Sequence, residues 1–161
     1  MLIRYASIRD IPQIKRIAEE TWPQAYATVI PQRQIDFMLK DMYSEEALET
    51  EFSDGRSFLI AETESEIIAF CSYYLKEPDV IRLPKLYVLP RLQRKGAGKK
   101  LIDTVAEIAK ELGAGVLELN LNRNNPSLQF YLKMGFDIFC EEDIPYYEYV
   151  LKDYVMRKKL S

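Results

Sequence analysis

The spacing of apolar residues along the chain predicts an ordered mixture of helices and strands. Apolar positions three and four residues apart predict helices from residue 7 to about 20, over 32–42 and 45–52, and most strongly over 101–112. Short β-rich runs predict strands at 2–5, 57–62, 67–75, 80–89 and 116–121, then a short helix at 126–134 and strands at 136–141 and about 147–157. This order, βαα(α)βββαβαββ, predicts a mixed α/β layer fold in a single domain over residues 1–161.

Individual residues mark where several of these elements begin, bend or end. Ser7 and Asp10 have the spacing of a capping box at the start of the first helix, and Gly113 ends the strongest helix. Because Pro84 cannot donate a ladder hydrogen bond, its strand is expected to lie at a sheet edge or to contain a bulge or bend.

The overall composition narrows the functional classes. With 161 residues, 48% of them hydrophobic and 29% charged, the chain can form a core without disulfides or a metal. A net charge of −3 argues against bulk nucleic-acid binding, and no apolar stretch is long enough to span a membrane. The first residues lack the pattern of a signal peptide, so a cytoplasmic location is expected.

The absence of histidine removes several kinds of chemistry. Without histidine there is no Ser-His-Asp triad, no Cys-His dyad and no imidazole base. Cys71 and Cys140 both lie in apolar runs, which predicts two buried thiols, no disulfide and no metal site. Proton transfer must therefore use carboxyl, phenol, amine or thiol groups, or water.

A glycine turn follows the strand at 80–89 and leads directly into the strongest helix. Residues 86–102 read LYVLPRLQRKGAGKKLI, with glycine at positions 96 and 98. Backbone N–H groups at such a helix start are unpaired and lie at the positive end of the helix dipole, which favours an anion. The turn lacks the third glycine of a dinucleotide-binding fingerprint and the Ser or Thr of a Walker loop. Five cations surround it: Arg91, Arg94, Lys95, Lys99 and Lys100.

Two motifs in this region resemble those of the GNAT superfamily of N-acetyltransferases. Residues 93–98, QRKGAG, are similar to the Q/R-x-x-G-x-G/A signature of that family and follow a strand end LYV-x-P. Asn124, Ser127, Leu128 and the run FYLKMGF at 130–136 are similar to its N-x-x-A-I-x-x-Y-E-K-x-G-F block. The resemblance, carried by residues 80–142, implies the acyl-CoA N-acyltransferase (GNAT) fold, a mixed and mostly antiparallel central sheet with flanking helices. It also implies acetyl-CoA as co-substrate.

The resemblance implies a role for each matched position. Acetyl-CoA is expected between the strand ending near Val88 and the strand ending near residue 121, with the backbone of Leu86, Tyr87 and Val88 pairing with the pantetheine arm. Asn124 is expected to position the cofactor. Tyr131 is expected beside the sulfur, where a phenol of pKa ~10 can donate a proton to a departing thiolate of pKa ~8.5. The pyrophosphate is expected to bind the backbone amides of Arg94, Lys95, Gly96, Ala97, Gly98 and Lys99.

No general base is identified in the sequence. Some family members carry a glutamate on the strand before the Asn motif, and the corresponding position here is Leu119 or Asn120, neither of which accepts a proton. Glu118 is nearby, and water relayed through backbone carbonyls is an equal alternative. Cys71 and Cys140 lie in apolar strands, which argues against an acyl-cysteine intermediate and favours direct transfer.

The acceptor pocket is expected at the first helices. Trp22 and Tyr26, placed just after the first helix, either contact an ammonium group or cap the core. Six acids and no Lys or Arg lie between residues 41 and 55, and they either steer a cationic acceptor or form a solvated helix face. The segments MYSEEAL and DYVMRKKL are similar to spermidine/spermine-type acetyltransferases. This similarity implies a polyamine or another small cationic primary amine as acceptor.

Other interpretations stay open on the sequence alone. A non-catalytic acyl-CoA-binding or regulatory module and an N-terminal protein or peptide acetyltransferase are the alternatives, and a longer acyl donor is equally compatible with the motifs. The tyrosine-rich C-terminal strand could pair across a homodimer, so monomer and homodimer are both compatible with the sequence.

Overall fold

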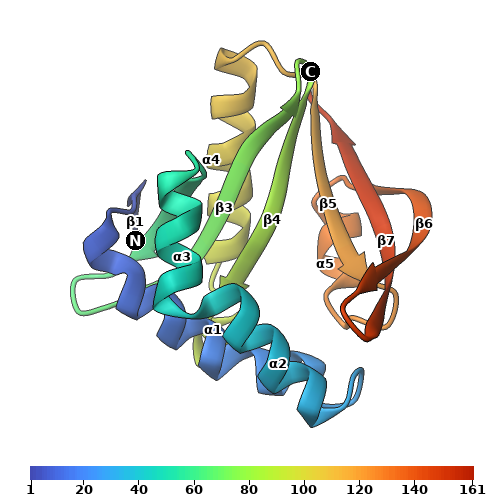
Figure 1. Cartoon of the computed structure of the whole chain (residues 1–161). Coiled ribbons are helices and arrows are strands. Elements are labelled where there is room, and N and C mark those ends of the chain that lie inside the picture. The colour runs from blue at the N-terminus through green and yellow to red at the C-terminus, as the bar shows by residue number, and fades with distance from the viewer.

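The computed structural model describes residues 1–161 and contains one seven-stranded sheet with helices on both faces (Figure 1). The strands lie in the order β1-β2-β3-β4-β5-β7-β6, and all neighbouring pairs except β4 and β5 are antiparallel. The predicted fold class and element order are confirmed. The elements are β1 (Leu2–Tyr5), η1 (Ile8–Asp10), α1 (Ile11–Tyr26), α2 (Gln32–Tyr43), α3 (Glu45–Ser53), β2 (Ser57–Glu62), β3 (Ile67–Glu77), β4 (Val80–Val88), η2 (Pro90–Leu92), α4 (Ala97–Glu111), β5 (Val116–Asn122), α5 (Leu128–Lys133), β6 (Asp137–Tyr146) and β7 (Tyr149–Lys159).

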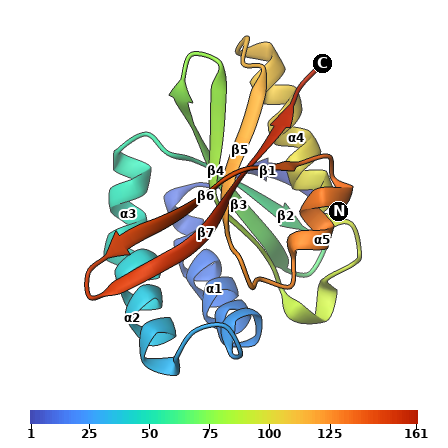
Figure 2. The same ribbon diagram turned by 90° about the vertical axis from the view of Figure 1, so that its right-hand side faces the viewer.

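Different helices cover the two faces of the sheet (Figures 1 and 2). Helix α4 lies along one face of β2, β3 and β4 and buries Leu101, Ile102 and Val105. Helices α1, α2 and α3 lie on the other face, where Ile14 and Ile17 of α1 are fully buried. Each fully buried aliphatic side chain stabilises the fold by about 1.5–3 kcal/mol, so these apolar faces hold the helices on the sheet. No helix is both long enough and apolar enough to cross a membrane.

Strands β4 and β5 separate after a short parallel pairing, as the V-shaped opening in Figure 1 shows. They pair only over residues 80–82 and 116–118, and beyond this point β4 pairs only with β3 and β5 only with β7. Pro84 follows closely, next to an irregularity in the β3–β4 ladder. The predicted bulge or bend at Pro84 is confirmed, whereas the edge-strand alternative is wrong because β4 is a central strand.

The C-terminal hairpin of β6 and β7 reaches across to helix α2 (Figure 2). Strand β7 lies between β5 and β6, so this tyrosine-rich strand, which could have paired across a homodimer, is internal, and β6 forms the sheet edge. At the hairpin tip the hydroxyls of Tyr146 and Tyr147 both donate to the Asp41 carboxylate of α2. Cys140 on the edge strand is only half-buried, which corrects the prediction of two buried thiols.

Helix α1 extends further than its apolar pattern predicts. Trp22 and Tyr26 lie inside the helix and not after it, and Pro23 is an internal residue. An internal proline costs a helix about 3 kcal/mol. The Trp22 side chain is buried, however, and its ring packs on Tyr26 with 4.7 Å between the centroids. This burial offsets the effect of the proline and continues the helix to Tyr26.

Candidate active site

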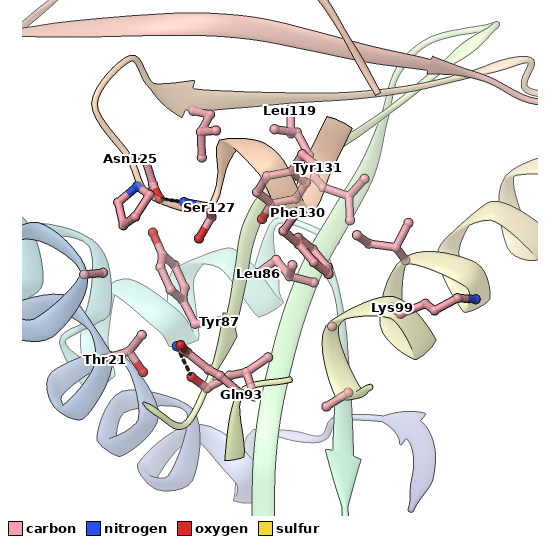
Figure 3. A pocket seen from close by; sticks show the side chains of 18 of the residues that line it. Thr21, Leu86, Tyr87, Gln93, Lys99, Leu119, Asn125, Ser127, Phe130 and Tyr131 are labelled. Carbon is pink, nitrogen blue, oxygen red and sulfur yellow. Dashed lines mark hydrogen bonds between the residues drawn. The ribbon is translucent and has the colours of Figure 1, made fainter. Parts of the chain in front are cut away.

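The space between the separated strands forms a cavity of about 870 Å³, which we call the β4–β5 cavity (Figure 3). The Leu89 amide donates to the Ile68 carbonyl of β3, and backbone groups alternate in direction along an antiparallel strand. The amides and carbonyls of Leu86 and Val88 therefore point away from β3, into the cavity. Gln93 Nε2 already donates to the Val88 oxygen there. A free strand edge of this kind can bind an extended chain that contains amides.

The start of helix α4 forms part of the β4–β5 cavity. Gly96 precedes the helix with a φ of +91°, and the Lys100 amide bonds back to the Gly96 oxygen. The amides of Ala97, Gly98 and Lys99 come earlier in the first turn and have no helical partner, and all three residues line the cavity. This arrangement favours an anion, as the sequence predicts.

Gly98 lies where helix α4 approaches two other elements closely. A Cβ atom at this position would lie 3.2 Å from Phe130 Cζ and 3.7 Å from Val88 Cγ2. Arg94 in the same turn has a left-handed backbone with a φ of 68°, a conformation that costs a non-glycine residue about 1–2 kcal/mol. Such conformations persist where the surrounding structure holds them, and they cluster at binding sites.

The cations near this turn differ in whether they are already paired. Three have partners within the protein: Lys99 with Asp103, Lys100 with the Met1 carbonyl, and Arg91 with Glu66. Arg94 makes no ion pair and lines the cavity. Lys95 is exposed and is not part of the lining, so the structure does not support its predicted contact with the pyrophosphate. Lys133, the lysine of the FYLKMGF run, lines the cavity and was missed by the sequence analysis.

Tyr131 projects from helix α5 into the β4–β5 cavity (Figure 3). Its ring packs edge-on against Phe130 and Phe136, and its hydroxyl has no hydrogen-bond partner in the protein. Burial raises the pKa of this hydroxyl above its ordinary value, so the group keeps its proton at neutral pH. Tyr131 can therefore donate a proton inside the cavity.

The asparagine that faces the cavity is Asn125 and not Asn124. Asn124 is exposed and outside the cavity lining, so the structure does not support its predicted contact with the cofactor. Asn125 is buried. Its Oδ1 accepts from the Ser127 amide at 2.7 Å, and its Nδ2 donates to Tyr26 Oη at 3.4 Å. The sequence has two adjacent asparagines, and only the geometry of the turn decides which one points inward.

A second cavity, of about 1070 Å³, lies among α1, α2, α3, β4 and β7, and we call it the α2–β7 cavity. Both residues predicted at the acceptor side line this cavity. Trp22 lines only this cavity, whereas Tyr26 lines both. Its aromatic lining residues are Trp22, Tyr26, Phe37, Tyr43, Tyr87 and Tyr147. Its charged lining residues are Asp41, Glu46, Glu51 and Asp153 against Lys40 and Lys85. Three of these acids belong to the acidic run that the sequence singled out.

The two cavities meet at four residues that line both of them: Tyr26, Pro84, Tyr87 and Asn120. The hydroxyls of Tyr26 and Tyr87 lie 3.0 Å apart at this junction. Burial raises the pKa of both phenols, so neither is a base near neutral pH. Asn120 reaches the same place from β5, and its Nδ2 donates to Asp153 Oδ2 at 3.2 Å.

Lys85 forms a buried part of the wall of the α2–β7 cavity. Its ammonium group contacts the Glu51 carboxylate, donates to the Met42 carbonyl at 3.1 Å and lies 4.4 Å from the centre of the Tyr43 ring. Burial lowers the pKa of Lys85, and the Glu51 carboxylate opposes this effect. A carboxylate, a carbonyl and an aromatic face thus already hold one ammonium group in this wall.

Glu118, which the sequence places near the site, is not available as a base. Its side chain is 1% exposed, and its oxygens lie 2.7 Å from Lys76 Nζ, 2.7 Å from Arg82 Nη1 and 2.9 Å from Arg157 Nε. Burial opposes ionisation, but hydrogen bonds from the three cations hold the pKa of Glu118 below its usual value. Its carboxylate is therefore committed to holding β3, β4, β5 and β7 together.

The site contains neither a reactive thiol nor a metal cluster. Cys71 is fully buried in β3, and burial raises the pKa of its thiol to about 12. A thiol of this kind is a poor nucleophile at neutral pH. No group of three or more Cys, Asp or Glu side chains is placed to hold a metal ion.

Sequence comparison connects this geometry with known proteins. Residues 11–136 match the Acetyltransferase (GNAT) family. A spermidine N(1)-acetyltransferase of Thermoplasma acidophilum is 30% identical over 98% of this chain and 96% of its own length. An uncharacterized N-acetyltransferase of Mycobacterium tuberculosis is 28% identical over 94% of this chain and 98% of its own length.

Solved structures with the same fold align with this chain over nearly its whole length, including the elements that line both cavities. A PaiA N-acetyltransferase from Thermoplasma acidophilum, in complex with coenzyme A, matches with a TM-score of 0.85 and 29% identity over 98% of each chain. The ribosomal-protein-S18-alanine N-acetyltransferase of Escherichia coli shares the fold, with a TM-score of 0.75 and 17% identity over 99% of this chain and 94% of its own.

Proposed function

The chain belongs to the acetyltransferase (GNAT) family and is an acetyl-CoA-dependent N-acetyltransferase, and from this premise we propose that its acceptor is a small, flexible amine with more than one positive charge. The observation that carries the proposal is the set of four carboxylates in the α2–β7 cavity, which adjoins the gap between β4 and β5. The similarity to a spermidine N(1)-acetyltransferase supports a polyamine.

We assign the β4–β5 cavity to acetyl-CoA, which supplies an acetyl group activated as a thioester. The free edge of β4 at Leu86 and Val88 fits the amide-bearing pantetheine arm, and the unpaired amides at the start of α4 fit the pyrophosphate. Arg94 and Lys133 add positive charge to the same lining. Glycine at position 98 keeps the passage between α4 and Phe130 open.

In this assignment Tyr131 protonates the departing thiolate. Its side chain lines the cavity, its hydroxyl makes no competing hydrogen bond, and its raised pKa keeps the hydroxyl protonated at neutral pH, so the acid form is present when the C–S bond breaks. Because the Cys71 thiol is fully buried and has a pKa of about 12, the acetyl group passes directly to the amine, without an acyl-cysteine.

The charge of the α2–β7 cavity suits an acceptor with separated cationic groups. Four carboxylates line it against two lysines, and Glu51 is already paired with Lys85. Asp41 and Glu46 are exposed, whereas Asp153 is half-buried beside the junction residue Asn120. The acids are thus spread from the surface to the junction. One ammonium group can reach the junction while a second interacts with the outer carboxylates.

Contacts at the hairpin tip favour a slender acceptor over a protein N-terminus. Tyr146 and Tyr147 donate to Asp41, and Arg33 of α2 pairs with Glu148 at 3.4 Å. These contacts bridge α2 and the β6–β7 hairpin on one side of the cavity. An extended peptide that crossed this side would have to break them, whereas an alkyl chain of polyamine width would not.

Steady-state acetylation of a matched amine series tests the proposal. 4-Amino-1-butanol and putrescine offer the same reacting group on chains of similar length, with a neutral and a charged tail, and spermidine adds a further charge. We expect kcat/KM to rise about tenfold from the neutral to the charged tail, which corresponds to ~1.4 kcal/mol of added attraction. Equal values for the two tails, or a preference for a peptide N-terminus, would contradict the proposed acceptor class.

A further inference from the structure

We propose that Asp153 is the base that receives a proton from the acceptor ammonium, and that Asn120 holds the amine beside it. The proposal rests on the assignment of the α2–β7 cavity to the acceptor. It identifies a proton-accepting group, which no residue of strand β5 supplies. Leu119 and Asn120 cannot take a proton, and Glu118 is bound by three cations. A carboxylate base must therefore come from an element other than β5, and β7 brings Asp153 to the α2–β7 cavity.

Asp153 is the carboxylate of the α2–β7 cavity that lies beside the junction. Its partner Asn120 lines both cavities, so the carboxylate is one hydrogen bond away from the surface that the acetyl group must reach. The other three acids of this cavity are placed differently: Asp41 beneath the hairpin-tip hydroxyls, Glu51 against the Lys85 ammonium, and Glu46 exposed on α3.

Asn120 has an unused acceptor atom at the same place. Its Nδ2 donates to Asp153, whereas its Oδ1 is buried and has no hydrogen-bond partner. A buried amide oxygen without a partner is destabilising, and an N–H of a bound amine would satisfy it. In this proposal the amine lies next to the Asp153 carboxylate, beside a residue that lines both cavities.

The surroundings of Asp153 make it a better proton acceptor than an exposed aspartate. Burial raises the pKa of the Asp153 carboxyl above its ordinary value, which brings it closer to neutral pH. The groups that face it from the neighbouring elements are Tyr26 of α1, Arg82 of β4, Asn120 of β5, Arg123 after β5 and Glu142 of β6. The hydrogen bond from Asn120 and the charges of the two arginines lower the pKa of Asp153, and Glu142 raises it. Burial has the largest effect, so the pKa of Asp153 is raised overall.

The proposed proton transfer fits a balanced acetyl transfer. The ammonium gives one proton to an Asp153 oxygen, which frees the lone pair of the nitrogen. This pair forms the N–C bond to the acetyl carbon as the C–S bond breaks and its electrons leave on sulfur. The sulfur takes the Tyr131 proton, and the second proton lost by the nitrogen restores Tyr131 through solvent. Asp153 then releases its proton to water, so each turnover yields one amide, one thiol and one proton.

The variant Asp153→Asn tests this assignment, because it keeps the side-chain size and removes only the ability to accept the proton. At pH 7 the kcat/KM for spermidine is expected to fall at least about 10²-fold. The remaining rate is expected to rise with pH toward the pKa of the free amine, since only amine that is already neutral reacts. Acetyl-CoA affinity, measured by calorimetry, is expected to stay unchanged because Asp153 does not line the β4–β5 cavity.

Two controls separate the role of Asp153 from charge and folding effects. Asp137→Asn removes an exposed carboxylate on the same hairpin, outside both cavities, and should leave kcat/KM unchanged. Asn120→Ser keeps the base and removes the amide, so it should raise the KM for spermidine more than it lowers kcat. The proposal is overturned if Asp153→Asn retains the wild-type kcat/KM and pH profile with normal acetyl-CoA affinity, or if it changes KM alone. A wrong acceptor class shows instead in the wild-type amine series.

Discussion

The hydroxyl groups of Tyr26 and Tyr87 lie 3.0 Å apart, at the point where the β4–β5 cavity opens into the α2–β7 cavity. Tyr26 comes from the end of α1 and Tyr87 from the central strand β4, so the contact joins two distant parts of the chain. Trp22 supports the pair, with its ring centroid 4.7 Å from that of Tyr26 and 5.9 Å from that of Tyr87. This aromatic cluster holds the walls of the two cavities in a fixed relation.

Tyr131→Phe is expected to lower kcat by about 10²-fold, the lower end of the contribution of a positioned general acid. The ring still packs against Phe130 and Phe136, so acetyl-CoA affinity and the unfolding temperature should change little. Stopped assays with putrescine at saturating acetyl-CoA measure the effect. Tyr154→Phe, on β7 and outside both cavities, is the control. A kcat within about twofold of wild type in Tyr131→Phe would exclude the proposed acid role.

Gly98→Ala is expected to weaken acetyl-CoA binding about tenfold with little loss of stability. The added methyl group would lie 3.2 Å from Phe130 Cζ, which forces the side of the passage to shift by a few tenths of an ångström. Gly55→Ala serves as a comparison, because Gly55 has a φ of +83° and open space around it. That change should lower stability by about 1 kcal/mol and leave acetyl-CoA affinity unchanged. Unchanged acetyl-CoA affinity in Gly98→Ala, with weakened affinity in Gly55→Ala, would mean that the Gly98 contact does not border the bound cofactor.

Glu46→Gln is expected to raise the KM for spermidine about threefold, since an exposed charge pair is worth about 0.2–1 kcal/mol. The adjacent Glu45 lies in the same first turn of α3 but outside the cavity lining, so Glu45→Gln is a matched control for net charge. The difference between the two variants should shrink in high salt, because salt screens exposed charges. Identical KM values for the two variants at low ionic strength would show that the outer acids do not attract the acceptor.

Glu118→Gln is expected to lower the free energy of unfolding at pH 7 by about 2–3 kcal/mol. This is somewhat less than the loss of one partner costs in a fully enclosed ion pair, because the three cationic partners of Glu118 are partly exposed. The pKa of Glu118 lies below its usual 4.5, so its stabilising effect is present above that pH and is lost as the pH falls through the lowered pKa. Denaturant titrations of wild type and variant should therefore converge in acid. Glu107→Gln, at an exposed position on α4, is the control. A difference that persists unchanged at low pH would contradict the ionic origin of the effect.

Local sequence patterns were sufficient to predict the element order and much of the β4–β5 cavity. The glycine turn at 96–98 and the apolar face of α4 are each encoded within about twenty residues, so they can be recognised without tertiary information. The role predicted for Tyr131 came instead from the resemblance to a family motif, most of which lies within one short helix. These features depend on the chain direction and on helix periodicity more than on contacts between distant segments.

Features that depend on distant contacts could not be predicted. Helix α1 continues through Pro23 because Trp22 is buried against Tyr43 and Tyr87, which lie far along the chain. The choice of Asn125 over Asn124 depends on a turn whose inner side chain meets Tyr26. Asp153 enters the site only because β7 pairs with β5, and a register shift of one residue would place its side chain on the opposite face.

In the proposed reaction, donor and acceptor meet at the junction of the two cavities. A crystal structure with a conjugate of coenzyme A and spermidine, joined through an acetyl linker, tests this most directly. We predict that the pantetheine arm follows Leu86 and Val88, that the linker lies between Tyr131 and Asn120, and that the polyamine arm occupies the α2–β7 cavity. A polyamine arm that leaves the junction in another direction, or a coenzyme A moiety bound outside the β4–β5 cavity, would contradict the account.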